Sequence, residues 1–219
     1  MTTNEAVAAQ PYYRELEQAD YQRMRVPRRY WGAHVDLISD ARVGGAISPR
    51  ALAQLYIERM PQMRKVGRGL VIYGPNGTGK TCIAVCLAFE FRRRGAPGLF
   101  LEAATLRSMI IEHEIFEDDQ LLIDRARAVP VLILDDLGKG IEDNSGFGLR
   151  AIDELIRHRS AAQRITFITT NYGQPELRAA LMPSTISALK EHCTAVAVLG
   201  EDRRDETYRR QTALLREQR

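Results

Sequence analysis

About a third of the way along its 219 residues, the chain reads Leu70-Val71-Ile72-Tyr73-Gly74-Pro75-Asn76-Gly77-Thr78-Gly79-Lys80-Thr81. The last eight of these residues match the phosphate-loop pattern G-x-x-x-x-G-K-[ST] at every fixed position. A chance Gly-rich turn could also produce the pattern. Here, however, an apolar strand precedes the loop and a helical run follows it, which is the context that the motif requires. The stretch therefore predicts a nucleoside-triphosphate site in an α/β fold.

Each residue type in the motif has a chemical reason. Glycines let backbone N–H groups surround the phosphates, and the following helix offers its positive end. Lys80 is expected to reach the β and γ oxygens, and Thr81 to ligate Mg²⁺. The residues expected to contact the nucleotide are Gly74, Pro75, Asn76, Gly77, Thr78, Gly79, Lys80, Thr81 and Cys82.

Length and composition bound the remaining possibilities. A chain of 24.7 kDa with 45% hydrophobic residues has room for one full α/β domain and a short extension. No apolar run is long enough to cross a bilayer, and Met1-Thr2-Thr3-Asn4-Glu5 lacks the layout of a secretion signal, so we expect a cytoplasmic protein without membrane contact. The three cysteines, Cys82, Cys86 and Cys193, have no metal-ligand spacing and are expected to pack in the interior.

Apolar runs of strand type alternate with helical patterns, which predicts a parallel sheet covered by helices on both faces. The fold class is thus a three-layer α/β sandwich with a central five-stranded parallel sheet. The strands are expected at residues 70–73, 98–102, 129–135, 164–170 and 195–199, and two amphipathic helices at 104–116 and 147–160.

Residues 1–45 differ from the rest, because tyrosines and a leucine alternate with charges there and a basic segment follows. We interpret them as a short helical extension and linker that binds a partner, or that simply docks on the main domain. Ser48 and Pro49 fit the cap and first residue of a helix over 50–60. The nucleotide domain is expected over residues 46–204, with a charged tail over 205–219.

Two acids follow the apolar run Val131-Leu132-Ile133-Leu134. A buried parallel strand would carry Asp135 and Asp136 to the carboxyl edge of the sheet, where open α/β sheets bind ligands. Asp135 is expected to hold Mg²⁺ through water, and Asp136 to orient the attacking water. Asn171 ends the next strand and could contact the γ-phosphate or the water. Purely structural roles are the alternatives. The two acids could form a turn after a core strand, and Asn171 could be a turn residue at the end of a strand.

The motifs, taken in order, resemble the AAA+ ATPases of the DnaC-type replicative helicase loader and IstB-type transposition group. The likeness covers roughly residues 27–204 and rests on the phosphate loop, Leu132 to Gly138, Ile168 to Asn171 and Val198 to Arg204. It implies that Lys80, Asp135, Asp136 and Asn171 are the catalytic residues of a magnesium-dependent ATPase. It also implies that Tyr30 lies near the adenine and that Arg203 stands at the family's C-terminal arginine position.

One position departs from the family pattern. The arginine that would reach into a neighbouring subunit's site is replaced by Ala188 in Ser187-Ala188-Leu189. Such an arginine contributes about three to five orders of magnitude to turnover. We therefore predict sound ATP binding and slow hydrolysis by the protein alone. Arg178, Arg203 or Arg204 could replace the missing side chain.

The resemblance implies a loader that forms a homo-oligomer and delivers a hexameric replicative helicase to single-stranded DNA. The alternatives are an accessory ATPase that binds duplex DNA and directs a transposase, and a small-molecule kinase with the same phosphate loop. Candidate DNA contacts are Arg107, Arg150, the cluster Arg92-Arg93-Arg94 and the basic tail, although solvated helix surface explains each of them equally well.

Overall fold

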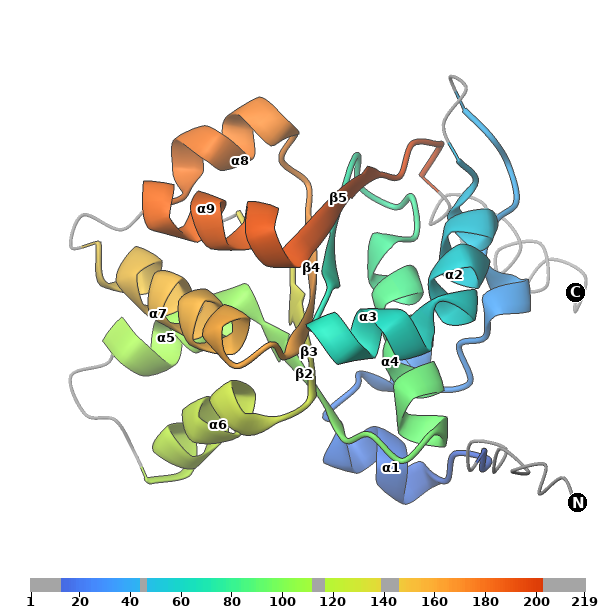
Figure 1. The fold of residues 1–219 in the computed structure, drawn as a ribbon, viewed down its shortest axis with the longest axis horizontal. Helices are drawn as coiled ribbons and strands as arrows, with labels where there is room; N and C mark the ends of the chain where they lie inside the picture. The colour runs from blue at the N-terminus through green and yellow to red at the C-terminus, as the bar shows by residue number, and fades with distance from the viewer. Residues whose placement is uncertain (1–12, 44–46, 112–116, 139–145, 203–219) are drawn as a thin grey trace, which may run out of the picture.

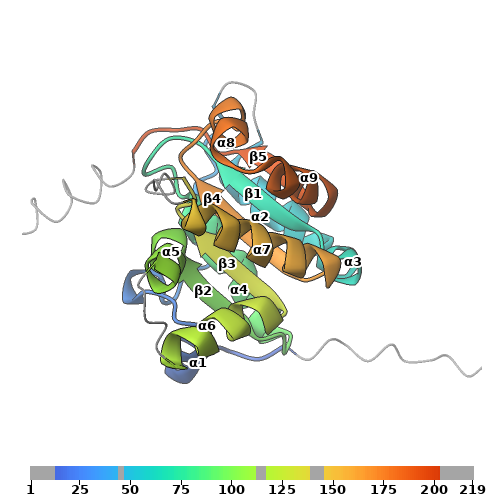
Figure 2. The same ribbon diagram turned by 90° about the vertical axis from the view of Figure 1, so that its left-hand side faces the viewer.

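The computed structural model describes residues 13–43, 47–111, 117–138 and 146–202. Five parallel strands form one sheet in the order β2-β3-β4-β1-β5 (Figure 2). They are β1 (Gly69–Tyr73), β2 (Gly98–Glu102), β3 (Val131–Asp135), β4 (Ile165–Thr170) and β5 (Cys193–Ala197). The predicted fold class, with its five-stranded parallel sheet, is confirmed.

Helices cover both faces of the sheet, as Figure 1 shows with the sheet edge-on. One side carries α1 (Gln18–Arg23), α2 (Pro49–Glu58), α3 (Met60–Val66) and α4 (Lys80–Arg93). The other carries α5 (Ala103–Ile111), α6 (Glu117–Ala128), α7 (Phe147–Ala161), α8 (Gln174–Ala180) and α9 (Pro183–His192). Two short 3-10 helices, η1 (Arg28–Tyr30) and η2 (Val35–Leu37), lie between α1 and α2.

Side chains that point alternately to the two faces of the sheet form two separate hydrophobic cores. Leu70 and Ile72 of β1 face the helices α2 and α4, whereas Val71 between them faces the core under α7 and α9. Because successive strand residues point to opposite faces, an apolar strand serves both layers at once. All of β1 to Ile72 and all of β3 are buried for this reason.

Several element boundaries differ from the predicted ones, and each has a local cause. Strand β3 begins at Val131 because Pro130 has no N–H for the sheet, and Val129 instead closes the end of α6. The helix predicted over 50–60 is two helices that meet at Arg59, where Pro61 enters the first turn of α3. Strand β5 lies at 193–197 rather than 195–199, since α9 runs directly into it. Part of the helix predicted over 104–116 lies outside the described residues.

The described part of the predicted extension packs against the main domain. Met24 and Val26 belong to the same core as α4, and Tyr21 stacks on Trp31 with ring centroids 5.4 Å apart. The backbone N–H of Phe100 donates to the carbonyl oxygen of Met24 at 2.7 Å, so the chain before η1 also lies along the outer strand β2. The described part of the extension therefore docks on the main domain, and partner binding by the extension stays a prediction.

A fully buried arginine connects elements on the face of the sheet that α6 and α7 cover. Arg159 of α7 donates to the carbonyl oxygens of Ala126, Val129 and Ile165 at 2.6–2.8 Å and to the Thr166 hydroxyl at 2.9 Å. Burial lowers the pKa of its guanidinium to about 9. One side chain thereby joins the end of α6 and the start of β4 to α7.

Candidate nucleotide and magnesium site

The phosphate loop joins β1 to α4 as the motif predicts. Gly74, Gly77 and Gly79 all have positive φ angles, and Gly79 is the residue before the first turn of α4. An L side chain rarely adopts these angles, so the loop needs glycine for its shape. The Thr78 hydroxyl donates to the Pro75 carbonyl oxygen at 3.0 Å and closes the loop on itself.

Lys80 holds its ammonium group at the loop. Its Nζ donates to the carbonyl oxygens of Gly74 at 2.8 Å and Pro75 at 2.6 Å, and the residue is buried. The cation therefore lies beside the first residues of the loop and adds to the positive end of α4. The Lys80 ammonium group would donate stronger hydrogen bonds to the charged oxygens of a bound phosphate than to these neutral carbonyl oxygens.

Asp135 ends β3 next to the first turn of α4. Its Oδ1 accepts hydrogen bonds from the hydroxyls of Thr81 at 2.8 Å and Thr169 at 2.6 Å. Burial raises the pKa of this carboxyl, and the two hydroxyl hydrogen bonds oppose the shift. A cation at this place would counter the burial and favour the charged form.

These residues fit Mg²⁺. The ion prefers hard oxygen ligands and is usually held by one or two carboxylates with substrate phosphates rather than by an all-protein cage. The Thr81 hydroxyl and the Asp135 carboxylate supply such oxygens beside the phosphate loop. The described residues contain no group of three or more His, Cys, Asp or Glu side chains placed to hold a metal.

Asp136 and Asn171 are brought together at the same edge of the sheet. The Asn171 Nδ2 donates to Asp136 Oδ1 at 2.7 Å, and the Asp136 backbone N–H donates to the Thr169 hydroxyl at 2.9 Å. Asp136 has a φ of 54°, a left-handed conformation that is uncommon outside glycine and often marks functional positions. Its side chain is exposed, unlike that of Asp135.

Thr169 is the residue that sequence reasoning missed. Its single hydroxyl donates to Asp135 and accepts from the backbone of Asp136, so it ties both acids to β4. Its place two residues before Asn171, on the strand next to β3, is a signal that could have identified it. Parallel pairing brings residues at equivalent positions of neighbouring strands side by side.

The remaining expected contacts differ in how the structure places them. Cys82 is half-buried in the first turn of α4 and hydrogen-bonds Cys86, which is buried as predicted. Tyr30 is half-buried against the core under Arg29, whose guanidinium lies 4.9 Å from the ring centroid. The placement of Tyr30 beside the base stays a prediction, and Arg203 lies outside the described residues.

The three arginines of the predicted basic cluster form ion pairs within the chain. Arg92 pairs with Asp20 at 2.7 Å, and Arg93 pairs with Glu90 at 2.6 Å. Arg94 pairs with the other oxygen of Glu90 at 2.5 Å. Since all three guanidinium groups hold carboxylates, we do not include this cluster among the proposed DNA contacts.

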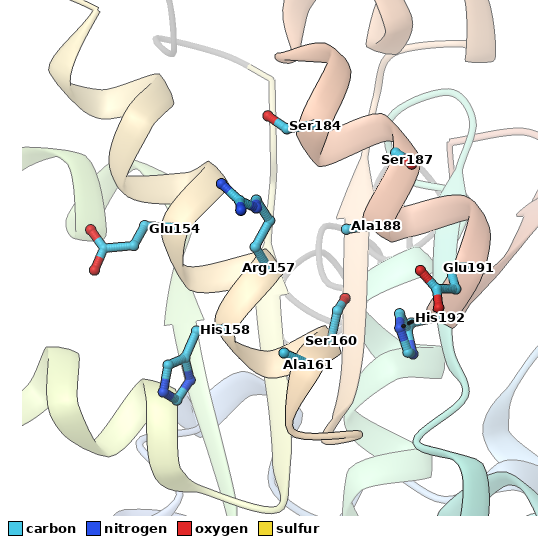
Figure 3. Close-up of a pocket in the computed structure, with 10 residues that line it drawn as sticks. All are labelled: Glu154, Arg157, His158, Ser160, Ala161, Ser184, Ser187, Ala188, Glu191 and His192. Atoms are coloured by element: carbon cyan, nitrogen blue, oxygen red, sulfur yellow. Dashed lines mark ion pairs between the residues drawn. The ribbon is translucent and has the colours of Figure 1, made fainter.

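Ala188 lines an open cavity on a different face of the molecule. The cavity has a volume of about 770 Å³ and lies between α7 and α9. Figure 3 shows Ala188 on the side of α9 toward α7, with Arg157 on α7 across from it. The cavity does not include the phosphate loop.

None of the helices among the described residues has the length and hydrophobicity to span a membrane.

Comparison with known proteins supports the fold class and identifies the family. Residues 70–190 match the model of the ATPase family associated with various cellular activities (AAA). A search among curated proteins found no match.

Solved structures share the fold. The DnaC helicase loader is 26% identical, with a TM-score of 0.65 over 79% of this chain and 100% of its own. DnaI is 22% identical, with a TM-score of 0.66 over 81% of this chain and 93% of its own. The replication initiator DnaA, solved with AMPPCP and single-stranded DNA, is 16% identical, with a TM-score of 0.61 over 80% of this chain and 51% of its own.

The resemblance to the DnaC-type group is thereby confirmed. The matched residues include the loop, both acids and Asn171 and make up more than half of the chain, so the chain belongs to the ATPase family associated with various cellular activities.

Proposed function

We propose that the chain is an ATP-dependent loader that delivers a hexameric replicative helicase to single-stranded DNA, with ATP binding and hydrolysis as the switch. The observation that carries the proposal is the hydrogen-bonded group at the sheet edge. Thr81, Asp135, Thr169, Asp136 and Asn171 form one connected set beside the phosphate loop. The likeness to the DnaC helicase loader supports the choice of partner.

In this proposal each residue of the group has a distinct task. Lys80 turns from the loop carbonyls to the β and γ oxygens of ATP, and Asp136 accepts a hydrogen bond from the attacking water. Asn171 fixes the direction of the Asp136 carboxylate through its amide. Thr81 and Asp135 would hold Mg²⁺, which would supply charge stabilisation at the phosphates.

Single-stranded DNA has a candidate contact surface at the start of α7. Phe147 is 55% exposed, and the Arg150 guanidinium lies 5.6 Å from its ring centroid. An exposed ring beside an arginine suits stacking of an unpaired base together with attraction of its phosphate. Arg107 of α5 is half-buried, on a helix that packs against α7.

The nucleotide part of the proposal is tested by calorimetric titration of Mg-ATP into the full-length chain. We expect binding by the wild type and by Asp136→Asn, and loss of binding by Lys80→Ala. In a pull-down with a hexameric replicative helicase and ATP, Asp136→Asn should retain the partner and Lys80→Ala should lose it. A wild type that does not bind Mg-ATP would refute the proposal.

The DNA part is tested by fluorescence anisotropy with a labelled oligothymidine and a duplex of equal length. Loss of one stacked base costs about 1–3 kcal/mol, so Phe147→Ala should weaken single-strand binding at least fivefold. The control is Arg157→Ala, which removes an exposed arginine from the same helix at the α7/α9 cavity. Tighter binding to the duplex, with filaments on it, would favour a transposition ATPase instead.

A further inference from the structure

The chain after β5 lies directly on the phosphate loop. The Val198 backbone N–H donates to the carbonyl oxygen of Tyr73 at 2.8 Å, just before the loop begins. A Cβ atom at Gly74 would lie only 2.2 Å from the carbonyl oxygen of Val198. Figure 1 shows this segment beside the turn that joins β1 to α4.

An acidic side chain of the same segment touches the loop. A Cβ atom at Gly77 would lie 1.7 Å from Asp202 Oδ1 and 2.7 Å from Oδ2, so both carboxylate oxygens lie against that residue. Gly77 occupies a variable position of the motif. In this chain its φ of 72° favours glycine, and a Cβ atom there would also displace the Asp202 carboxylate.

We infer that Asp202 is a built-in competitor for the phosphate loop, whose carboxylate must move or be repelled when the phosphates of a nucleotide bind. The inference rests on the proposed function, since it concerns the same nucleotide site. The loop, the start of α4 and Lys80 attract anions. A carboxylate on the loop benefits from that attraction and opposes a polyphosphate there.

The size of the effect follows from Coulomb's law. Two unit charges about 4 Å apart interact by about 1 kcal/mol in water and more strongly near a protein surface. Asp202 is exposed, so the lower value applies, which corresponds to a change in affinity of about fivefold. Because the effect is repulsion between charges, it should increase with the number of phosphates and disappear for adenosine.

The test uses calorimetric titration of the full-length protein with Mg-ATP, Mg-ADP and adenosine. Asp202→Asn keeps the shape of the side chain and removes its charge. We expect it to bind Mg-ATP about fivefold more tightly than the wild type, Mg-ADP with a smaller gain, and adenosine equally. The matched control is Glu201→Gln, which removes the neighbouring exposed carboxylate and should bind all three as the wild type does.

Two results would overturn the inference. Unchanged or weaker Mg-ATP binding by Asp202→Asn would show that the carboxylate does not compete, and an equal gain for adenosine would show a general structural effect. Both results leave the proposed function standing, because Mg-ATP still binds. Failure of the wild type to bind Mg-ATP would instead refute the proposed function itself.

Discussion

At the scale of single residues, the site depends on hydroxyl groups and on one amide as much as on charges. Thr169 joins Asp135 to the backbone of Asp136, and Asn171 holds the Asp136 side chain. The two acids differ in surroundings, since Asp135 is buried and Asp136 is exposed. Burial beside hydroxyls suits a metal ligand, whereas exposure suits a group that must meet water.

Removal of the Asn171 amide should therefore affect catalysis more than binding. In Asn171→Ala the Asp136 carboxylate loses its partner at 2.7 Å and becomes free to rotate. We expect the single-turnover rate of ATP hydrolysis to fall at least tenfold, with the Mg-ATP dissociation constant within twofold of the wild type. An affinity that falls as much as the rate would show that Asn171 binds nucleotide in the ground state instead.

At the scale of elements, α4 connects the nucleotide site to the N-terminal segment. Its first residue is Lys80, and Arg92 near its end donates to the buried Asp20 of α1. Arg14 binds the same carboxylate at 2.5 and 2.7 Å. A helix of six residues is too short to be stable alone, so these pairs and the packing of Met24 hold α1 in place.

The Asp20 pairs predict a dependence of stability on pH. Hydrogen bonds from Arg14 hold the pKa of Asp20 well below its usual range, with Arg92 adding to the effect. The pKa of Asp20 is lower in the folded protein than in the unfolded chain, where it is about 4. The ionised carboxylate therefore stabilises the fold fully above about pH 4, and this stabilisation is lost as the pH falls toward the pKa of the folded state. Asp20→Asn should cost about 1–3 kcal/mol of unfolding free energy at pH 7, and the cost should shrink below about pH 4.

Urea unfolding at pH 7 and pH 3 measures this difference. The control is Asp124→Asn, which breaks an exposed pair with Arg127 at 3.4 Å and should change stability by less than about 0.5 kcal/mol at either pH. Equal destabilisation of Asp20→Asn at both pH values would contradict the assignment to charge.

At the scale of the whole molecule, the position of Ala188 bears on catalysis in the proposed assembly. The residue lies on α9, away from the phosphate loop of its own chain, and lines the cavity shared with α7. An arginine there could act only on the site of a neighbouring copy. In the proposed assembly, the slow hydrolysis that we expect of this chain would therefore come from the contact between copies rather than from the nucleotide pocket.

Restoring the arginine should raise turnover. We expect Ala188→Arg to increase steady-state ATP hydrolysis at least tenfold, with a steeper dependence on protein concentration, since such an arginine contributes about 10³–10⁵ in well-formed sites. Ser187→Arg, on the adjacent exposed position, is the control and should have little effect. Brisk hydrolysis by the wild type that Arg178→Ala abolishes would show that another arginine already has this role.

The sequence by itself determined the sheet and the phosphate loop, and it predicted which residues form the catalytic set. A strand, a glycine loop and an apolar run that ends in two acids are local patterns, and the chemistry of phosphate binding restricts their residue types. Helices α6, α8 and α9 were not predicted, because α6 has few buried apolar residues and α8 and α9 are short and begin near prolines. Their packing against the sheet decides whether they form.

Only the tertiary structure decided which distant residues meet. The hydroxyl of Thr169 between two acids, the carbonyl oxygens around Arg159 and the Asp202 carboxylate on Gly77 all join segments far apart in the chain. Local patterns alone do not bring these partners together, because the contacts follow from the order of strands in the sheet and from the path of the chain after β5. The motif therefore predicted a ligand for the loop, and the fold decided which distant side chain lies against the loop.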